Sequence, residues 1–301
     1  MNKKLSMAVA SAVMAFGASA ANAGITIPAG DWTIDIGGNV NTYYTNTNFS
    51  QDLSSNVPGA PTNDSANEVS TGLLPSALGI GGKTRQNDLD IAFQFTFFVG
   101  ANSTSAGSGA FGGNGAGGNS LNIRQAFMTF GDASWGTIKM GRDLGLFGSD
   151  AILSDMTLLG VGQGAGGAGS STLGRIGAGY LYADWVGQIQ YASPNWNGFS
   201  FAAAIREPWG NSSNSTLGYD GKVAYEWAGD AAGKVWAGYI HQKLRSTSTA
   251  TSDNSNTASA WEIGGKVGYA GFGLVAYYYD GQNMGLPAIA NATELTGLFL
   301  A

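Results

Sequence analysis

Apolar and polar residues alternate along several segments of the chain. From Leu89 to Val99, apolar residues occupy every second position, and polar residues such as Gln94 and Thr96 stand between them. Successive side chains of a β-strand point to opposite faces, so this spacing predicts a strand with one apolar and one polar face. The alternation and the turn signals together predict eleven strands and the start of a twelfth near Glu294. The eleven cover residues 32–44, 72–83, 88–99, 121–131, 136–142, 176–193, 199–206, 219–228, 234–243, 260–269 and 272–280.

Two kinds of β protein share this alternation. In a soluble sandwich the apolar face forms the core, whereas in a membrane barrel it meets lipid and the polar face lines the lumen. The connections favour the barrel, because long and short ones follow each other in turn, as outer loops and periplasmic turns do in barrels. The long connections are 45–70, 101–120, 144–174, 207–218 and 243–259, and the short ones are 84–87, 132–135, 194–198, 229–233 and 270–271. We therefore expect an all-β, transmembrane antiparallel β-barrel.

The N-terminus has the three parts of a secretory signal peptide. Lys3 and Lys4 precede an apolar run of small residues, and Ala21-Asn22-Ala23 forms a small-x-small cleavage site. Cleavage after Ala23 is expected, and an uncleaved membrane anchor is the alternative. The first 23 residues carry two lysines and no acidic residue, so their removal changes the formal net charge from −6 to −8.

Composition narrows the class further. Charged residues make up only 11% of the chain and aromatic residues another 11%, which is unlike a disordered protein. The 48 glycines disfavour helices, because an interior glycine costs about 1 kcal/mol relative to alanine. Cysteine is absent, which excludes a disulfide framework and a thiolate metal site. Neither a metal nor a cofactor is expected.

Several segments resemble one family. The stretch "RQAFMTFGDASWGTIKMGRD", from Arg124, resembles a strand–turn–strand unit of the Gram-negative outer-membrane general porins, which are trimeric diffusion porins. Its Arg-x-Ala-Phe start and Gly-Thr-x-x-x-Gly-Arg finish carry the resemblance. The next residues, "LGLFGSDAILSDMTLLGVG", are similar to the start of the porin constriction loop. "TGLLPSALGIGGKT" and "YASPNWNGFSFAAA" also look like porin hairpin segments.

The resemblance implies both a fold and a function. It implies a 16-stranded barrel, of which residues 24–301 hold about 11–12 strands and lack the C-terminal ones, with a constriction loop at 144–174 folded inward. It implies a water-filled channel of the outer membrane for passive diffusion of ions and small hydrophilic solutes, without enzymatic activity. The expected partners are two further copies in a homotrimer, outer-membrane lipids and lipopolysaccharide, and no nucleic acid.

The predicted pore constriction combines basic wall residues with acidic loop residues. The resemblance assigns Arg124 and Arg175 to the wall and Asp155 to the loop, and Lys139 and Asp150 complete the predicted set. Where some relatives carry a loop glutamate four positions after the aspartate, this chain has Leu159, so the resemblance implies a less acidic loop. The net charge of −8 favours cations, whereas the basic wall favours anions, and the sign of the ion selectivity stays open.

Strand parity places the other basic residues. With Ile138 and Met140 outward, Lys139 points into the lumen and Arg142 falls on the outward face, as a rim or subunit-contact residue. Lys83 and Arg85 are possible lumen groups beside a short turn. With Phe127 outward, Arg124 points inward, whereas Gln125 and Thr129 share the outer face with Phe127.

Other functions find less support in the residues. A Ser-His hydrolase would depend on His241, the single histidine, which has no acidic residue near it in the sequence. The glycine-rich stretch from Gly162 is not followed by the Gly-Lys-Ser/Thr of a phosphate-binding loop. A substrate-specific outer-membrane channel and a structural or adhesive barrel remain as alternatives.

The signal peptide generates the first prediction. We expect the mature chain to begin at Gly24 in the outer-membrane fraction, because Ala23 closes the cleavage site. N-terminal sequencing of the protein from that fraction checks this. Recovery of an intact Lys3-Lys4 end would contradict it and favour the uncleaved anchor.

Overall fold

The computed structural model describes residues 24–48, 65–71, 74–101, 121–155, 157–162, 179–181, 183–208, 216–245, 255–284 and 294–300. These residues form fifteen strands and a short helix, α3 (Ser149–Leu153). The strands are β1 (Ile25–Ala29), β2 (Trp32–Asn39), β3 (Thr42–Asn48), β4 (Ser65–Thr71), β5 (Ser76–Gln86), β6 (Leu89–Val99), β7 (Leu121–Asp132), β8 (Gly136–Leu144), β9 (Trp185–Ala192), β10 (Phe199–Arg206), β11 (Gly218–Trp227), β12 (Ala231–Arg245), β13 (Ser255–Tyr269), β14 (Phe272–Gln282) and β15 (Glu294–Leu300).

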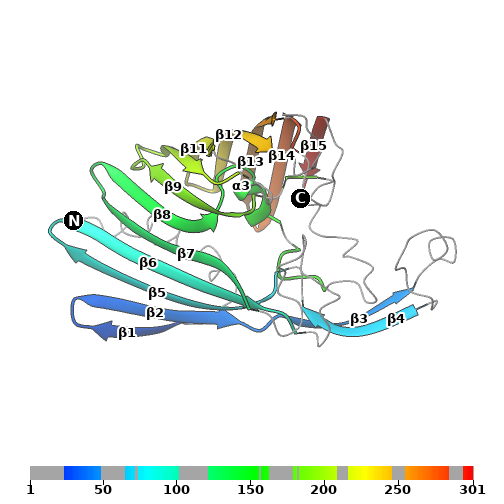
Figure 1. Cartoon of the computed structure of the whole chain (residues 1–301), viewed down its shortest axis with the longest axis horizontal. Coiled ribbons are helices and arrows are strands. Elements are labelled where there is room, and N and C mark those ends of the chain that lie inside the picture. The colour runs from blue at the N-terminus through cyan, green and yellow to red at the C-terminus, as the bar shows by residue number, and fades with distance from the viewer. Residues whose placement is uncertain are drawn as a thin grey trace.

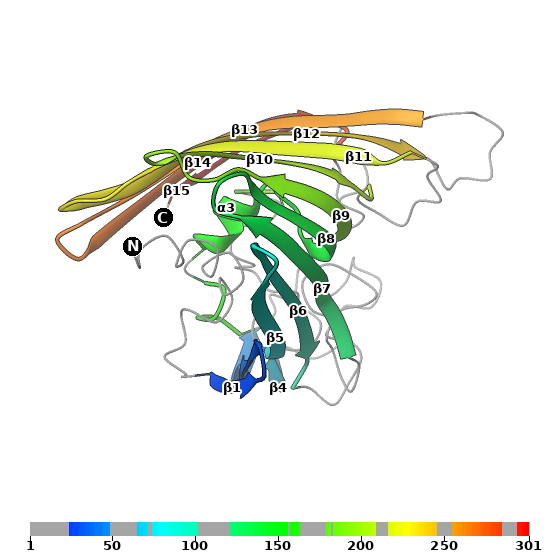
Figure 2. The same ribbon diagram turned by 90° about the vertical axis from the view of Figure 1, so that its left-hand side faces the viewer.

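Thirteen of these strands form one antiparallel sheet in chain order. The order is β1-β2-β5-β6-β7-β8-β9-β10-β11-β12-β13-β14-β15, and β3 pairs with β4 in a separate two-stranded sheet. The large sheet curves strongly, and α3 lies on its concave side (Figure 2). The two-stranded sheet extends away from the end of β2 and β5 that carries the long connections (Figure 1). The expected all-β antiparallel architecture is therefore present.

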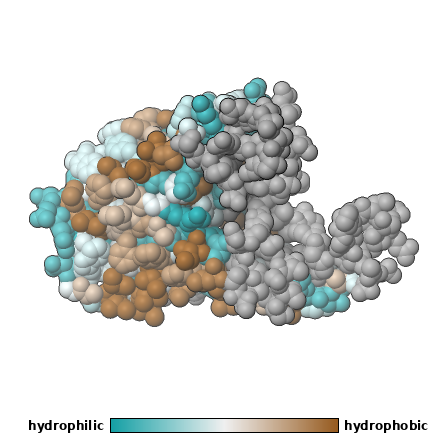
Figure 3. Space-filling model, viewed as in Figure 1, coloured by the Kyte–Doolittle hydropathy of each residue, from teal (hydrophilic) through white to brown (hydrophobic). Residues whose placement is uncertain are grey.

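The two faces of the sheet differ as the alternation predicted. In β6, Phe95 and Val99 are 44% and 40% exposed, whereas Thr96 and Phe98 are buried against the concave side. Figure 3 shows hydrophobic residues gathered over the strands and hydrophilic ones at the edge with the short turns. Within the described part of the chain, no helix is both long enough and apolar enough to cross a membrane.

The short connections are tight turns. Asn87 and Asp88 join β5 to β6 with φ of 49° and 62°, and Ala270 and Gly271 join β13 to β14 with φ of 50° and 85°. Two successive residues with positive φ are the signature of type I′ turns, whose twist matches that of the flanking strands. Large aromatic side chains such as that of Trp196 are exposed at this end of the sheet, as in the interfacial girdles of barrels.

The first predicted strand and the long polar connection after it were wrong in detail. The strand expected over 32–44 is broken between β2 and β3, because Asn41 bonds outside the ladder. Its backbone N–H donates to Ser76 Oγ over 2.9 Å, and its side-chain amide donates to the Leu74 carbonyl. The connection expected over 45–70 is partly the β3–β4 hairpin, in which Tyr44 donates to Asn67. β1 was not predicted at all.

The strand predicted over 176–193 is much shorter in the structure. β9 begins at Trp185, because Asp184 has a φ of 57° that a strand cannot accommodate, and its Oδ1 accepts the Trp185 N–H. The described residues before it, including Tyr180 and Leu181, lie buried beside α3. The apolar residues of this segment, which suggested a strand, therefore pack beside α3 on the concave side of the sheet.

The backbone conformation of β8 explains the glycine of its Gly-Arg pair. Gly141 has a φ of 128°, and a Cβ there would lie 2.3 Å from the Ala126 carbonyl oxygen. Because an L side chain is strained at such a φ, we expect Gly141→Ala to lower the free energy of unfolding by about 1–3 kcal/mol. Urea unfolding in lipid vesicles, followed by tryptophan fluorescence, measures this change.

Gly273 supplies the matched control for this prediction. It lies in β14, and a Cβ there would meet no atom within 4 Å. Gly273→Ala should therefore be neutral or stabilising by up to about 1 kcal/mol. Equal unfolding midpoints for the two variants would show that the conformation of Gly141 is not required.

Candidate functional site

The segment after β8 turns back over the concave face of the sheet. Phe147, Ala151 and Ile152 are buried, and they pack in one cluster with side chains such as Trp236 and Tyr277 that point inward from β12 and β14. Figure 2 shows α3 within the curve of the sheet. The apolar residues of this segment therefore cover the inner wall instead of facing the lumen.

Two wall carboxylates hold the backbone of this segment. Asp220 Oδ2 on β11 accepts the N–H groups of Leu146 and Phe147 over 3.1 and 3.3 Å. The side chain of Asp220 is fully buried and also pairs with Arg206 Nη1 on β10 over 3.4 Å. Because the backbone groups of an irregular segment need partners once they are buried, Asp220 supplies bonds that the sheet ladder cannot.

The second carboxylate belongs to Glu262 on β13. Glu262 Oε2 accepts the N–H of Gly148 over 2.8 Å and the hydroxyl of Tyr277 over 2.7 Å. Gly148 precedes α3 with a φ of 77°, and a Cβ there would lie 2.7 Å from the Leu181 carbonyl oxygen. The segment can approach the wall this closely because glycine stands at this position.

A cluster of charges fixes α3 itself. Asp150 Oδ2 lies 2.6 Å from Lys222 Nζ on β11, and Asp150 Oδ1 lies 2.6 Å from Lys234 Nζ on β12. Lys234 also lies 3.2 Å from the exposed Glu226. Burial alone would raise the pKa of Asp150, but the two ammonium groups outweigh it and hold the pKa below its usual range. The carboxylate therefore stays ionised, and both ion pairs persist into acidic conditions.

The same segment reaches a distant part of the sheet a few residues later. The Leu158 carbonyl accepts the N–H of Leu74 over 2.9 Å, and the Leu159 carbonyl accepts the hydroxyl of Tyr43 on β3. The Leu159 side chain packs with buried Leu74 and Phe98. We call residues 145–162 the strap, because its two ends bind the β10–β14 wall and the β3–β6 region.

Arg124 lies on the inner face, although the expected parity around it was wrong. Gln125 and Thr129, predicted outward with Phe127, are buried at 5% and 6% exposure, and Phe127 is buried at 5%. The register between β6 and β7 shifts between Thr96 and Phe97, so Arg124 is the extra residue of a bulge. Because a bulge re-aims one side chain, Arg124 and Gln125 both point inward.

The inner wall around Arg124 carries further polar contacts. Its guanidinium lies 4.5 Å from the centre of the Phe98 ring, an attractive cation–π arrangement. Lys139 pairs with Asp143 over 2.5 Å, and Gln125 donates to the other oxygen of Asp143 over 2.9 Å. Lys139 thus lies inward, as expected, and its charge is compensated locally.

The remaining predicted residues that the structure describes lie apart from one another. Asp155 is buried in the strap, where it accepts the hydroxyl of Tyr180 and the N–H of Thr157. Arg142 is exposed and donates to the Trp185 carbonyl over 3.2 Å.

Lys83 and Arg85 lie near the short turns. Lys83 is 3.8 Å from Asp35, and Arg85 pairs with Asp90 and Asp132 over 2.9 Å each. Arg175 lies outside the described residues, so the structure does not place it beside Asp155.

Comparison with known proteins identifies the family. A sequence model of the Gram-negative porin family matches residues 9–296. The chain belongs to the Gram-negative porin family. It is therefore a diffusion channel of the outer membrane and not an enzyme. No curated protein matches the sequence.

The chain is also similar to solved porin structures, of which OmpF bears on the fold. OmpF of Salmonella typhi, solved in complex with daunomycin, shares 21% sequence identity at a TM-score of 0.55, and the match covers 86% of this chain and 68% of that one. An OmpT variant of Vibrio cholerae that lacks loop L8 shares 15% identity at a TM-score of 0.46, over 84% and 70% of the two chains. The similarity to OmpF supports a porin barrel over a soluble sandwich.

Four residues that contact the strap of this porin were missed at the level of sequence. Asp220, Lys222, Lys234 and Glu262 lie on β11, β12 and β13, and their side chains point to the inner face of the sheet, where they contact the strap or its ion pairs. Nothing in the sequence distinguished them from other lumen residues, because their partners lie about 70 or more positions away. His241, the residue on which an enzyme would depend, stacks on Tyr219 with 4.9 Å between ring centres.

The carboxylate of Glu262 generates a prediction for the porin. In Glu262→Ala, the N–H of Gly148 and the hydroxyl of Tyr277 lose their acceptor, at about 1–3 kcal/mol for each buried donor left unpaired. We expect the strap to leave the wall more often, which single-channel recordings detect as more frequent current fluctuations.

Glu226→Ala is the control, because Glu226 is exposed on the same wall and pairs with Lys234 rather than with the strap. Its recordings should resemble those of the unmodified porin. A Glu262→Ala channel as quiet as this control would show that the carboxylate does not hold the strap.

Proposed function

We propose that the strap narrows the channel and sets which solutes cross it. The observation that carries this proposal is the attachment of residues 145–162 at two distant parts of the sheet, through Asp220 and Glu262 at one end and Leu74 and Tyr43 at the other. A segment held in this way crosses the space inside the curved sheet. It would reduce the cross-section that is left for solutes, as a constriction loop does.

The proposed filter acts through hydration and charge. A solute that enters a narrow passage loses part of its bulk water, and charged or polar side chains replace some of that hydration. Arg124 and Lys139 supply such groups on β7 and β8. Asp150 and Lys222 supply them where the strap meets β11. An apolar solute would have to displace ordered water from these groups, which costs free energy. Small hydrophilic solutes are the class that such a passage admits.

We further propose that the ion selectivity is weak. Several charges on the described inner wall are matched within short distances: Lys139 with Asp143, Arg206 with Asp220, and Asp150 with two lysines of which one also meets Glu226. Local compensation leaves little net potential to favour one sign of ion. The net charge of the chain is a poor guide to the ion selectivity, because it counts groups far from the passage.

The assembly and export steps are also proposals. We propose that the porin forms a homotrimer and contacts outer-membrane lipids and lipopolysaccharide through its outward face. Exposed apolar side chains such as those of Ile25, Ile27 and Leu78 on β1 and β5 fit burial against a neighbouring subunit or lipid. We also propose that residues 1–23 are the signal peptide and residues 24–301 the barrel, with the constriction loop 144–174 including Asp155 and, on the wall, Arg175.

Reconstitution into a planar bilayer tests the proposed channel. Stepwise conductance with unsaturated flux of small sugars and ions is the expected result. Conductance that saturates with one solute class would favour a substrate-specific channel. Folded protein without conductance would favour a structural or adhesive barrel and overturn the proposal.

Two substitutions test the proposed charge matching. Asp150→Asn removes the carboxylate shared by Lys222 and Lys234, of which Lys234 keeps Glu226, and should favour anions, whereas Arg124→Ala removes a positive charge and should favour cations. One unit charge about 8 Å from an ion in water contributes about 0.5 kcal/mol, so the permeability ratio should change about twofold. Reversal potentials across a salt gradient measure the ratio.

Ionic strength and a remote charge provide the controls. Both shifts should shrink at high salt, because the Debye length falls from about 10 Å at 0.1 M to about 3 Å at 1 M. Asp88→Asn removes a charge at a short turn far from the strap and should leave the ratio unchanged. If Asp150→Asn and Arg124→Ala behave like Asp88→Asn, these side chains do not face the conducting path.

A further inference from the structure

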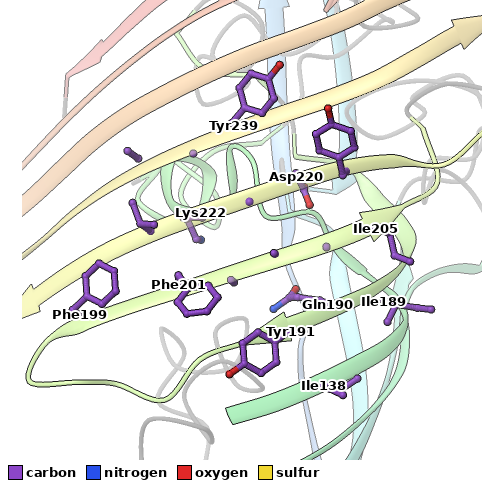
Figure 4. A pocket seen from close by; sticks show the side chains of 18 residues that line it. Ile138, Ile189, Gln190, Tyr191, Phe199, Phe201, Ile205, Asp220, Lys222 and Tyr239 are labelled. Atoms are coloured by element: carbon purple, nitrogen blue, oxygen red, sulfur yellow. The ribbon is translucent and has the colours of Figure 1, made fainter. Parts of the chain in front are cut away.

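The outward face of the sheet contains an apolar hollow of about 990 Å³ over β8–β12. Its floor is formed by small residues, chiefly Ala203 on β10 and Gly221 on β11, which are register partners. Larger side chains surround this floor, as Figure 4 shows for Ile189, Tyr191, Phe201, Ile205 and Tyr239.

The hollow arises from the order of large and small residues across four strands. Tyr191 pairs with Ala203, Ala203 with Gly221, and Gly221 with Tyr239. Along the strands, Phe201 and Val223 form a second neighbouring pair on one side of the floor, and Ile205 and Tyr219 form one on the other. Two small residues side by side are therefore enclosed by bulky ones in every direction.

Neither backbone conformation nor crowding requires glycine at position 221. A Cβ there would lie 3.5 Å from the Ala202 carbonyl oxygen, which is an ordinary contact, and the φ of Gly221 is not in the left-handed region. Elsewhere in the sheet glycine makes room for a neighbour: a Cβ at Gly264 would lie 2.1 Å from the Trp236 ring. The space above Gly221 is thus available to something outside the chain.

The hollow is separate from the channel. Asp220 and Lys222, the neighbours of Gly221, point to the other side of the sheet and bind the strap. The large side chains around the hollow are about half exposed, at 44% for Ile189, 49% for Ile205 and 45% for Tyr239. The hollow is continuous with the outward apolar face that a porin presents to the membrane.

We propose that this hollow is a binding site for one lipid acyl chain. Its length suits such an occupant: from Phe201 to Ile205 the strand rises about 13 Å, at about 3.3 Å per residue. That is close to one leaflet, since the hydrocarbon core of a bilayer is about 30 Å thick. An unfilled apolar hollow forfeits dispersion contacts, and the acyl chains around the barrel are the molecules that can restore them.

Polar groups lie at the end of the hollow that is nearer to the long connections. The rings of Tyr219 and His241 stack there at 4.9 Å. The polar atoms of such rings favour the boundary between hydrocarbon and water, where a lipid headgroup lies. The proposal rests on the outer-membrane location of the porin and does not depend on how the channel selects solutes.

Photolabelling of the full-length porin tests this site. The porin is reconstituted in phosphatidylcholine vesicles that contain a small fraction of phosphatidylcholine with a diazirine on one acyl chain, and labelled peptides are mapped by mass spectrometry after irradiation. We expect labelling around Ala203 and Gly221 to exceed labelling at Ile263 and Ala276, outward residues of β13 and β14, by about fourfold, the effect of one additional buried methylene group.

A filled hollow distinguishes the site from general contact with the membrane. Ala203 and Ala276 are both exposed on the outward face, so neither Ala203→Trp nor Ala276→Trp has to enter a packed core. Ala203→Trp should reduce the labelling of the hollow to the level of the control positions, whereas Ala276→Trp should leave it unchanged. Conductance should be unaltered in both variants.

Three results would overturn the proposal. One is equal labelling of the hollow and the control positions, and another is undiminished labelling in Ala203→Trp. The third is a porin–porin cross-link through the hollow, which would show that a second copy occupies it. Absence of conductance in the unmodified porin would instead contradict the proposed channel. The labelling result would still decide whether the hollow binds an acyl chain.

Discussion

The whole structure depends on one constraint: in hydrocarbon, every backbone N–H and C=O must find its partner within the protein. Antiparallel strands meet it by pairing with their neighbours, and pairing forces successive side chains to opposite faces. One face is then free to be apolar, as Phe95 and Val99 are, and the other to carry charge. The pairing of the backbone thus creates the two separate faces of this porin, and the alternating side chains make one apolar and the other polar.

The strap meets the same constraint by other means. It leaves the ladder after Leu144, so its N–H groups cannot pair with a neighbouring strand. Asp220 and Glu262 accept three of them, and these carboxylates are available because they lie on the inner, polar face. A single feature of the sheet, its polar concave side, therefore provides both the wet wall of the channel and the attachment of the segment that crosses it.

Local rules predicted most of the fold, and they failed where contacts were distant. Alternation placed β6 within a residue of its bounds, and the turn signals located the short connections. Alternation could not reveal the bulge at Arg124, because a bulge adds a residue without changing composition, and it therefore assigned Gln125 and Thr129 to the wrong face. Asp150 stays a predicted constriction residue, and no sequence signal marked its partners Lys222 and Lys234, which are over 70 residues away.

The double attachment of the strap has a mechanical consequence. Bonds from Asp220 and Glu262 tie it to one part of the sheet, and bonds from Leu74 and Tyr43 tie it to another. A tie between two parts of a thin curved shell acts as a cross-brace, so lateral pressure from the bilayer would be borne in part by the strap. The segment that we propose as the constriction would then also stiffen the wall and keep its bore constant as the tension of the membrane changes.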